Sequence, residues 1–128
     1  MDRKLTFVAI GAIFWLLAAI LMKYLGPIVF DGGLIHILWF VANFAFGAVA
    51  VVAIAKLTGR TRHDMLVPTA IMAMPVMIMD GLSVTLDARG LKHIYADTPL
   101  VAAYTGGFLL FAIWSFIFFA LMWHRAGA

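Results

Sequence analysis

The sequence has no cysteine, which excludes disulfides, thiolate metal sites and thiol chemistry. It is also poor in charge, because only 12% of its 128 residues are Asp, Glu, Lys or Arg, roughly half the share of an ordinary soluble domain. The nine Lys and Arg residues give a formal net charge of +3 but are scattered over short polar segments, so we expect no nucleic-acid partner. Hydrophobic residues, by contrast, make up 66% of the chain.

These hydrophobic residues fall into four blocks, each close to the ~20 residues that span the hydrocarbon core of a bilayer. We therefore predict an all-α integral membrane fold, a single four-transmembrane-helix bundle over residues 1–128. The predicted spans are residues 5–25, 34–57, 65–86 and 100–123. The first is expected to end before the turn signal Gly26-Pro27. The fourth is expected to begin with Thr98 as its cap and Pro99 in its first turn.

Basic residues flank the spans unevenly, and membrane proteins keep more Lys and Arg on the cytoplasmic side. With the N-terminus inside, the inner segments hold Arg3, Lys4, Lys56, Arg60, Arg62 and Arg125. The outer segments hold Lys23, Arg89 and Lys92. We therefore predict that the N and C termini are both cytoplasmic.

The third span carries a carboxylate within its hydrophobic length, Asp80, and a helix-bending Pro75. An acidic residue at the centre of a membrane helix costs roughly 2.5–3.5 kcal/mol on insertion scales, so such residues usually face the protein interior. Helical spacing places Asp80 on one face with Thr69, Ser83 and Asp87. We expect this face to be the polar stripe of the third span.

A second polar stripe, His36 and Asn43, lies on one face of the second span. We expect the two stripes to face each other, because lipid would leave their polar groups unpaired. The fourth span is expected to add Tyr104 near the same end, and the predicted pocket is floored by Trp15, Phe40 and Phe111. Its candidate proton- or cation-binding residues are Asp80, His36, Ser83, Asn43 and Tyr104.

Two interpretations of this cluster stay open. In one, Asp80 is a titratable group with His36 or Tyr104 as its partner, because intramembrane ionisable residues often mark proton or ion paths. In the other, the cluster is structural and holds three helices in register. Helix-packing roles are assigned to Trp15, Gly26, Gly47, Pro75, Gly106 and Gly107.

Other chemistry finds little support in the sequence. The third span holds five methionines, whose thioethers suit Cu(I), but they do not converge with a histidine, and methionine is an ordinary filler of packed helices. The four histidines fall at different ends of the predicted spans, which argues against a shared haem. No nucleophilic side chain has a general base at a sequence spacing that would indicate a catalytic pair. We therefore expect no metal, no cofactor and no enzymatic activity.

Two stretches, GAIFWLLAAILMKYLG over residues 11–26 and MIMDGLSVTL over residues 77–86, resemble the small four-span bacterial membrane proteins grouped as domain of unknown function 5367. The resemblance implies the same topology and a location in the prokaryotic cytoplasmic membrane, but it implies no activity. It gives weight to Trp15, Gly26, Asp80 and Ser83. This chain departs from the family at residues 85–87, where Thr-Leu-Asp replaces an aromatic residue after the Ser-Val pair.

The function that these observations favour is proton- or cation-coupled transport or permeation, with Asp80 as the binding group. We expect a homodimer in the lipid bilayer, because four helices enclose little volume. The alternative is a non-catalytic accessory subunit that stabilises or assembles a larger membrane complex through its lipid-facing aromatic residues.

Overall fold

Four long helices form the whole framework of the computed structural model, which describes residues 3–90 and 93–127. The helices are α1 (Arg3–Val29), α2 (Leu34–Leu57), α3 (Leu66–Ala88) and α4 (Pro99–Ala126), with a short 3₁₀ helix η1 (Arg62–Asp64) before α3. Each long helix has the length and apolar composition needed to cross a membrane. In lipid every backbone N–H and C=O group must bond within the protein, and helices meet that demand. The predicted all-helical class with four candidate spans is confirmed.

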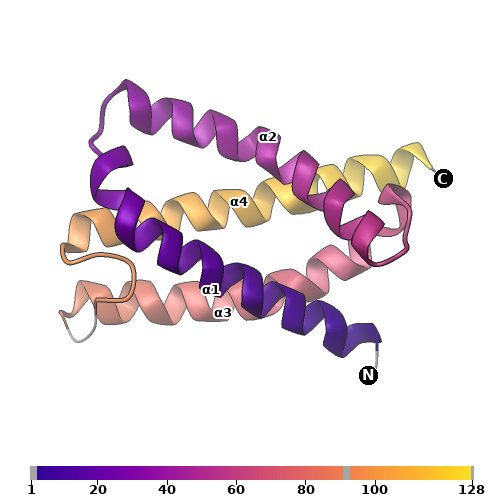
Figure 1. Ribbon diagram of the computed structural model, residues 1–128, viewed down its shortest axis with the longest axis horizontal. Coiled ribbons are helices and arrows are strands. Elements are labelled where there is room, and N and C mark those ends of the chain that lie inside the picture. The colour runs from indigo at the N-terminus through magenta and orange to yellow at the C-terminus, as the bar shows by residue number, and fades with distance from the viewer. Residues whose placement is uncertain (1–2, 91–92, 128) are drawn as a thin grey trace.

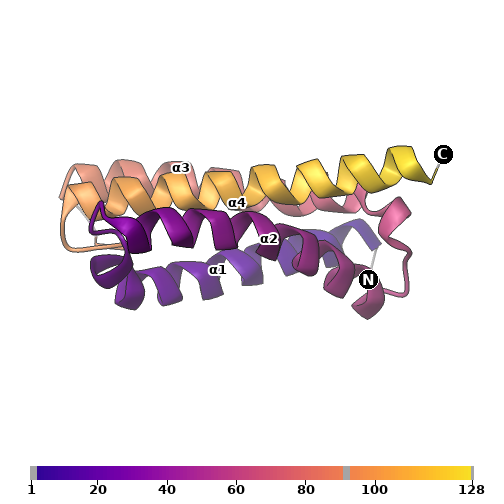
Figure 2. The ribbon, with the colours of Figure 1, turned by 90° about the horizontal axis from the view of Figure 1, so that it is seen from above.

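The helices are arranged in two layers, with α3 and α4 in one and α1 and α2 in the other (Figure 2). Helix α1 crosses diagonally over α4 and α3, while α2 and α3 lie on opposite sides of α4 (Figure 1). The closest packing is between α1 and α3, between α2 and α4, and between α3 and α4. The predicted meeting of the polar stripes of α2 and α3 is therefore wrong, because α4 lies between these two helices and both pack against it instead of against each other.

Both termini and the α2–α3 connection lie at one end of the bundle, which we call the terminal end (Figure 1). The opposite end, which we call the loop end, holds the α1–α2 connection and residues 93–98. The six predicted inner cations all lie at the terminal end, whereas Lys23 and Arg89 lie at the loop end. Lys92, the third predicted outer cation, lies outside the described residues.

Helix α1 does not stop at Gly26-Pro27 as predicted but continues to Val29. Pro27 removes one backbone donor, yet so close to the end of a helix this affects only one bond. The next turn still closes, because the backbone N–H of Phe30 donates to the Gly26 carbonyl at 2.9 Å. A Cβ at Gly26 would lie 3.3 Å from the Val101 side chain, so α4 packs directly against this turn.

Small residues set the close approach of the other helices. A Cβ added at Gly11 would lie 2.9 Å from the Met72 Cα, so α1 and α3 meet backbone to backbone there. One added at Gly47 would lie 2.9 Å from the Ser115 Cβ, which brings α2 against α4. Gly106 is buried against Val84, whereas Gly107 is exposed with no atom within 4 Å of an added Cβ. The predicted packing role fits Gly106 and is wrong for Gly107.

Candidate functional site

The polar stripe of α3 is buried along its whole length, as the helical spacing predicts. Asp80 is 2% exposed, and Thr69, Ser83 and Asp87 on the same face are all buried. Asp80 lies eight residues before the end of α3 at Ala88, about 12 Å from the loop end at 1.5 Å per residue. A carboxylate at that depth lies well inside the bundle and needs hydrogen-bond donors from its neighbours.

Two donors converge on one oxygen of Asp80. The Trp15 indole of α1 donates from Nε1 to Asp80 Oδ1 at 2.9 Å. The Tyr95 hydroxyl, which comes from the segment between α3 and α4, donates to the same oxygen. Trp15 Nε1 and the Tyr95 hydroxyl oxygen are themselves only 2.8 Å apart. The three side chains therefore form a closed, three-membered cluster from three different parts of the chain.

The second oxygen of Asp80 is different. Oδ2 is buried, and no hydrogen-bond donor among residues 3–90 and 93–127 reaches it. Buried polar atoms are almost always paired, so one that is not calls for a specific explanation. A proton carried on Oδ2 would remove the buried negative charge, and a small cation bound beside Oδ2 would supply the missing partner.

Residues 93–98 fold into the loop end of the bundle and carry Tyr95 to Asp80. Tyr95 is 0% exposed, and the following residue, Ala96, is also buried. The Asp87 carboxylate holds this segment by its backbone, accepting from the N–H groups of Ile94 and Tyr95, both at 2.7 Å. Lys23 of α1 adds a bond from Nζ to the His93 carbonyl at 2.9 Å. The two carboxylates of α3 therefore have different roles. Asp87 binds the backbone of the segment, and Asp80 binds the Tyr95 side chain.

The chemical state of Tyr95 follows from its surroundings. Burial, the hydrogen bond to Asp80 and the negative charge of that carboxyl all raise the pKa of the Tyr95 hydroxyl above its ordinary value. The side chains of Trp15 and Ser83, the latter one turn from Asp80 on α3, act in the opposite direction and lower this pKa, with a smaller effect. Tyr95 therefore keeps its proton at neutral pH and acts as a donor to Asp80.

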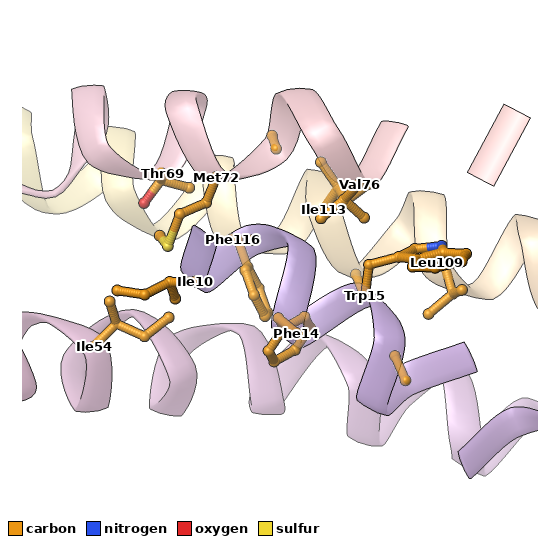
Figure 3. Close-up of a pocket in the computed structure, with 14 residues that line it drawn as sticks. Ile10, Phe14, Trp15, Ile54, Thr69, Met72, Val76, Leu109, Ile113 and Phe116 are labelled. Atoms are coloured by element: carbon orange, nitrogen blue, oxygen red, sulfur yellow. The ribbon is translucent and has the colours of Figure 1, made fainter. Parts of the chain in front are cut away.

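A small cavity of about 30 Å³ lies on the terminal side of this cluster. Residues from all four long helices line it, including Trp15 from α1 and Thr69 from α3 (Figure 3). The Thr69 hydroxyl is buried and has no hydrogen-bond partner among the residues that the structure describes. The cavity is large enough for a water molecule. Trp15 thus both lines this cavity and donates to Asp80.

The remaining predicted candidates belong to a different part of the molecule. His36 lies among aromatic rings, with its ring centroid 4.7 Å from that of Tyr104 and 5.2 Å from that of Phe30. Asn43 donates from Nδ2 to the Phe108 carbonyl of α4 at 3.0 Å. Of the five candidates, only Asp80 and Ser83 therefore come together. His36, Asn43 and Tyr104 lie in the contact between α2 and α4.

The predicted pocket floor is also divided. Trp15 lies beside Asp80 and bonds to it directly, which is closer than expected. Phe40 and Phe111 pack against each other, with ring centroids 5.6 Å apart, in the α2–α4 contact. Sequence reasoning missed Tyr95 entirely. The available signal was the apolar Ile94-Tyr95-Ala96 run inside an otherwise polar connection.

Comparisons with known proteins add no assignment: no family model matches this chain, and no curated protein or solved structure is significantly similar to it. The resemblance to small four-span bacterial proteins therefore stays a prediction. Within residues 3–90 and 93–127, no three His, Asp or Glu side chains are grouped so as to hold a metal ion.

Proposed function

We propose that this chain is a small multi-pass protein of the cytoplasmic membrane that takes up and releases a proton or a small cation at Asp80 during transport. The observation that carries the proposal is the asymmetry of the Asp80 carboxylate. Both donors bind Oδ1, while the buried Oδ2 lacks a partner among the described residues. A purely structural carboxylate would gain from pairing both oxygens, because an unpaired buried polar atom costs about 1–3 kcal/mol.

The surroundings of Asp80 support two opposed routes of access. On the loop side, release of the Tyr95 segment from Asp87 would uncover Asp80. On the terminal side, rotation of the Trp15 indole would join Asp80 to the cavity that reaches Thr69. Tyr95 closes the first route and Trp15 closes the second, and both donate to Oδ1. A change in the charge of Asp80 therefore strengthens or weakens the hydrogen bonds that keep both routes closed. Alternate opening of the two routes is the transport step that we infer.

The cation distribution supports the inferred orientation. Six cations lie at the terminal end against two at the loop end within the described residues. The rule that favours cytoplasmic Lys and Arg therefore supports a location of both termini inside. Asp80 would then be reached from outside through the Tyr95 segment. A homodimer remains part of the proposal, because the cavity of about 30 Å³ within one chain is too small for a continuous pathway.

Proton flux in proteoliposomes tests this function. An imposed pH gradient should drive flux through the wild-type protein, measured with a trapped pH-sensitive dye, and Asp80→Asn should reduce it to the level of empty vesicles. Asn keeps the oxygen that accepts from Trp15 and Tyr95, so Asp80→Asn should remain folded. Asp31→Asn is the matched control, because Asp31 is an exposed loop carboxylate whose one hydrogen bond within residues 3–90 and 93–127 is local, to the Gly33 N–H. Equal flux in wild type and Asp80→Asn would contradict the proposal.

A second function, assembly of a larger membrane complex, is favoured by one surface feature. Aromatic rings of α2 and α4 form a continuous row with neighbouring centroids about 5–6 Å apart, made of Phe44, Phe111, Trp114, Phe118, Phe119 and Trp123. Trp114 in this row is 49% exposed. If assembly is the function, Trp114→Leu should lose partners during mild-detergent purification, and Asp80→Asn should leave both flux and partner retention unchanged.

A further inference from the structure

The terminal end carries a second feature that the Asp80 cluster does not use, a pocket of about 460 Å³ between the starts of α1 and α3, the α2–α3 connection and the end of α4. Its wall includes three cations and one carboxylate. These charged residues are Arg3, Lys4, Arg60 and Asp64. The described wall is therefore net positive, and Asp64 already accepts a hydrogen bond on Oδ2 from the Thr61 hydroxyl at 2.7 Å.

Arg60 is held in place by both its backbone and its side chain. Its N–H donates to the Ala55 carbonyl at 2.8 Å, and the Gly59 N–H donates to the Lys56 carbonyl at 3.2 Å. This pair of bonds is the Schellman motif that ends α2, and it needs the left-handed Gly59, whose φ is +66°. The Arg60 guanidinium lies over the buried Phe7 ring, 5.3 Å from its centroid. Stacking covers one face of the guanidinium and leaves its N–H edge for a ligand.

The apolar side of the same pocket continues along the surface of α3. Val67 and Ile71 line the pocket, and Met74 and Ile78 follow them at helical spacing on the same face of the helix. Val67, Met74 and Ile78 are 61–66% exposed. The pocket thus joins a basic end to an exposed apolar track that runs into the membrane region. A free anion would contact only the basic end, whereas an anionic lipid would contact the basic end with its head group and the apolar track with an acyl chain.

We propose that this pocket binds the phosphate group of an anionic phospholipid, with Arg60 as the principal ligand and one acyl chain lying along Val67, Ile71, Met74 and Ile78. Arginine binds phosphate through paired N–H groups, with better geometry than a point charge. Basic pockets between helices on the cytoplasmic side suit anionic head groups. No side chain caps the N-terminus of α3, which begins in the pocket wall, so the helix dipole adds to the attraction for an anion. The site is independent of any proton chemistry at Asp80.

Thermal stability of the purified protein in a neutral detergent tests the proposal. Added phosphatidylglycerol should raise the melting temperature in a saturable way, whereas phosphatidylcholine and inorganic phosphate should not. Arg60→Gln should weaken this lipid response by about fivefold, because one cation near a lipid surface is worth about 1 kcal/mol. Arg62→Gln is the matched control, since the Arg62 guanidinium lies over Trp123 instead, 5.6 Å from the ring centroid. Arg3→Gln, at an exposed pocket residue, provides a second variant should Arg60→Gln fail to fold, and it should also weaken the response.

Three results would overturn the proposal. Equal responses to phosphatidylglycerol and phosphatidylcholine would show that the head-group charge is not recognised. An equal loss of the phosphatidylglycerol response in Arg3→Gln and Arg62→Gln would show that the lipid responds to general surface charge and not to this pocket. A full response to inorganic phosphate alone would show a site for a free anion and remove the role of the acyl track.

Discussion

Hydrogen bonds join α1 to α3, whereas aromatic rings join α2 to α4. In the first contact, the Trp15 indole bonds to Asp80 and the inserted Tyr95 completes the cluster. In the second, Phe40 packs on Phe108 with ring centroids 5.5 Å apart, and Phe44 on Phe119 at 4.9 Å. Hydrogen bonds demand particular atoms at particular distances, whereas ring packing tolerates exchange of one apolar side chain for another.

The difference between the two contacts identifies the one whose bonds depend on the charge of a side chain. A change of charge on Asp80 alters two bonds at once, because Trp15 and Tyr95 both donate to Oδ1. In the α2–α4 contact, Asn43 carries no charge and its bond is to backbone, and His36 packs on the rings of Phe30 and Tyr104. Under the proposed function, the α1–α3 contact with its loop would respond to this change, whereas the α2–α4 contact would stay fixed.

The largest expected effect comes from removing the acceptor in the hydrogen-bonded contact. Asp80→Leu leaves the Tyr95 O–H buried without its acceptor, at about 1–3 kcal/mol. The Trp15 N–H loses Oδ1 but retains the Tyr95 hydroxyl oxygen, 2.8 Å away. Adding about 0.5–1.5 kcal/mol for the bond that Trp15 loses, we expect a loss of about 1.5–4.5 kcal/mol in the free energy of unfolding, measured by titration with a denaturing detergent in mixed micelles. Asp80→Asn, which retains the accepting oxygen, should lose much less. Equal losses in the two variants would mean that Oδ1 is not the acceptor.

Two tryptophans allow a matched test of the comparison itself. Trp15 Nε1 donates to Asp80, whereas Trp39 Nε1, in α2, is buried with no partner among the described residues. Trp15→Phe should cost about 1–3 kcal/mol through the lost donor. Trp39→Phe removes a donor that is already unpaired, so its cost should be smaller in the same unfolding assay. A greater loss for Trp39→Phe would reverse the assignment of the two contacts.

The contribution of the inserted Tyr95 to the stability of the hydrogen-bonded contact should depend on pH. Since the pKa of Tyr95 is raised in the folded protein, its contribution to stability is present below the ordinary tyrosine pKa of about 10 and is lost as the pH rises above it. The stability advantage of wild type over Tyr95→Phe should therefore shrink as the pH rises from about 10 to about 12. Unfolding titrations of both proteins across this range measure it. A constant difference would indicate that Tyr95 ionises as easily folded as unfolded.

The smallest effect is expected in the ring-packed contact. Asn43→Leu keeps the branching and the number of side-chain heavy atoms and removes one bond, to the Phe108 carbonyl, so it should cost about 0.5–1.5 kcal/mol. Proton flux through this variant should match wild type, because Asn43 lies apart from Asp80. Loss of flux in a folded Asn43→Leu protein would bring the α2–α4 contact into the transport path and remove the distinction between the two halves.

The sequence was sufficient for the four helices and for the inward orientation of Asp80, because hydrophobic length and helical spacing are local properties. It was not sufficient for the partners of Asp80. Which helix packs against α3 depends on close approach at Gly11 and Met72, and this cannot be read from either helix alone. The insertion of Tyr95 was equally hidden, because an irregular segment is held by distant groups, here Asp87 and Lys23. The continuation of α1 through Pro27 likewise depends on packing against α4.

The central claim is that the Asp80 carboxyl exchanges a proton or a cation inside the folded bundle. Infrared difference spectroscopy of wild type and Asp80→Asn, recorded as pH and then salt are varied, follows that group directly. If Asp80 exchanges a proton or a cation, its carboxyl band should change reversibly under these conditions and should be absent in Asp80→Asn. The band should shift in Tyr95→Phe, where one hydrogen bond to Oδ1 is lost. An Asp80 band that stays the same at every pH and salt concentration at which the protein remains folded would contradict this claim.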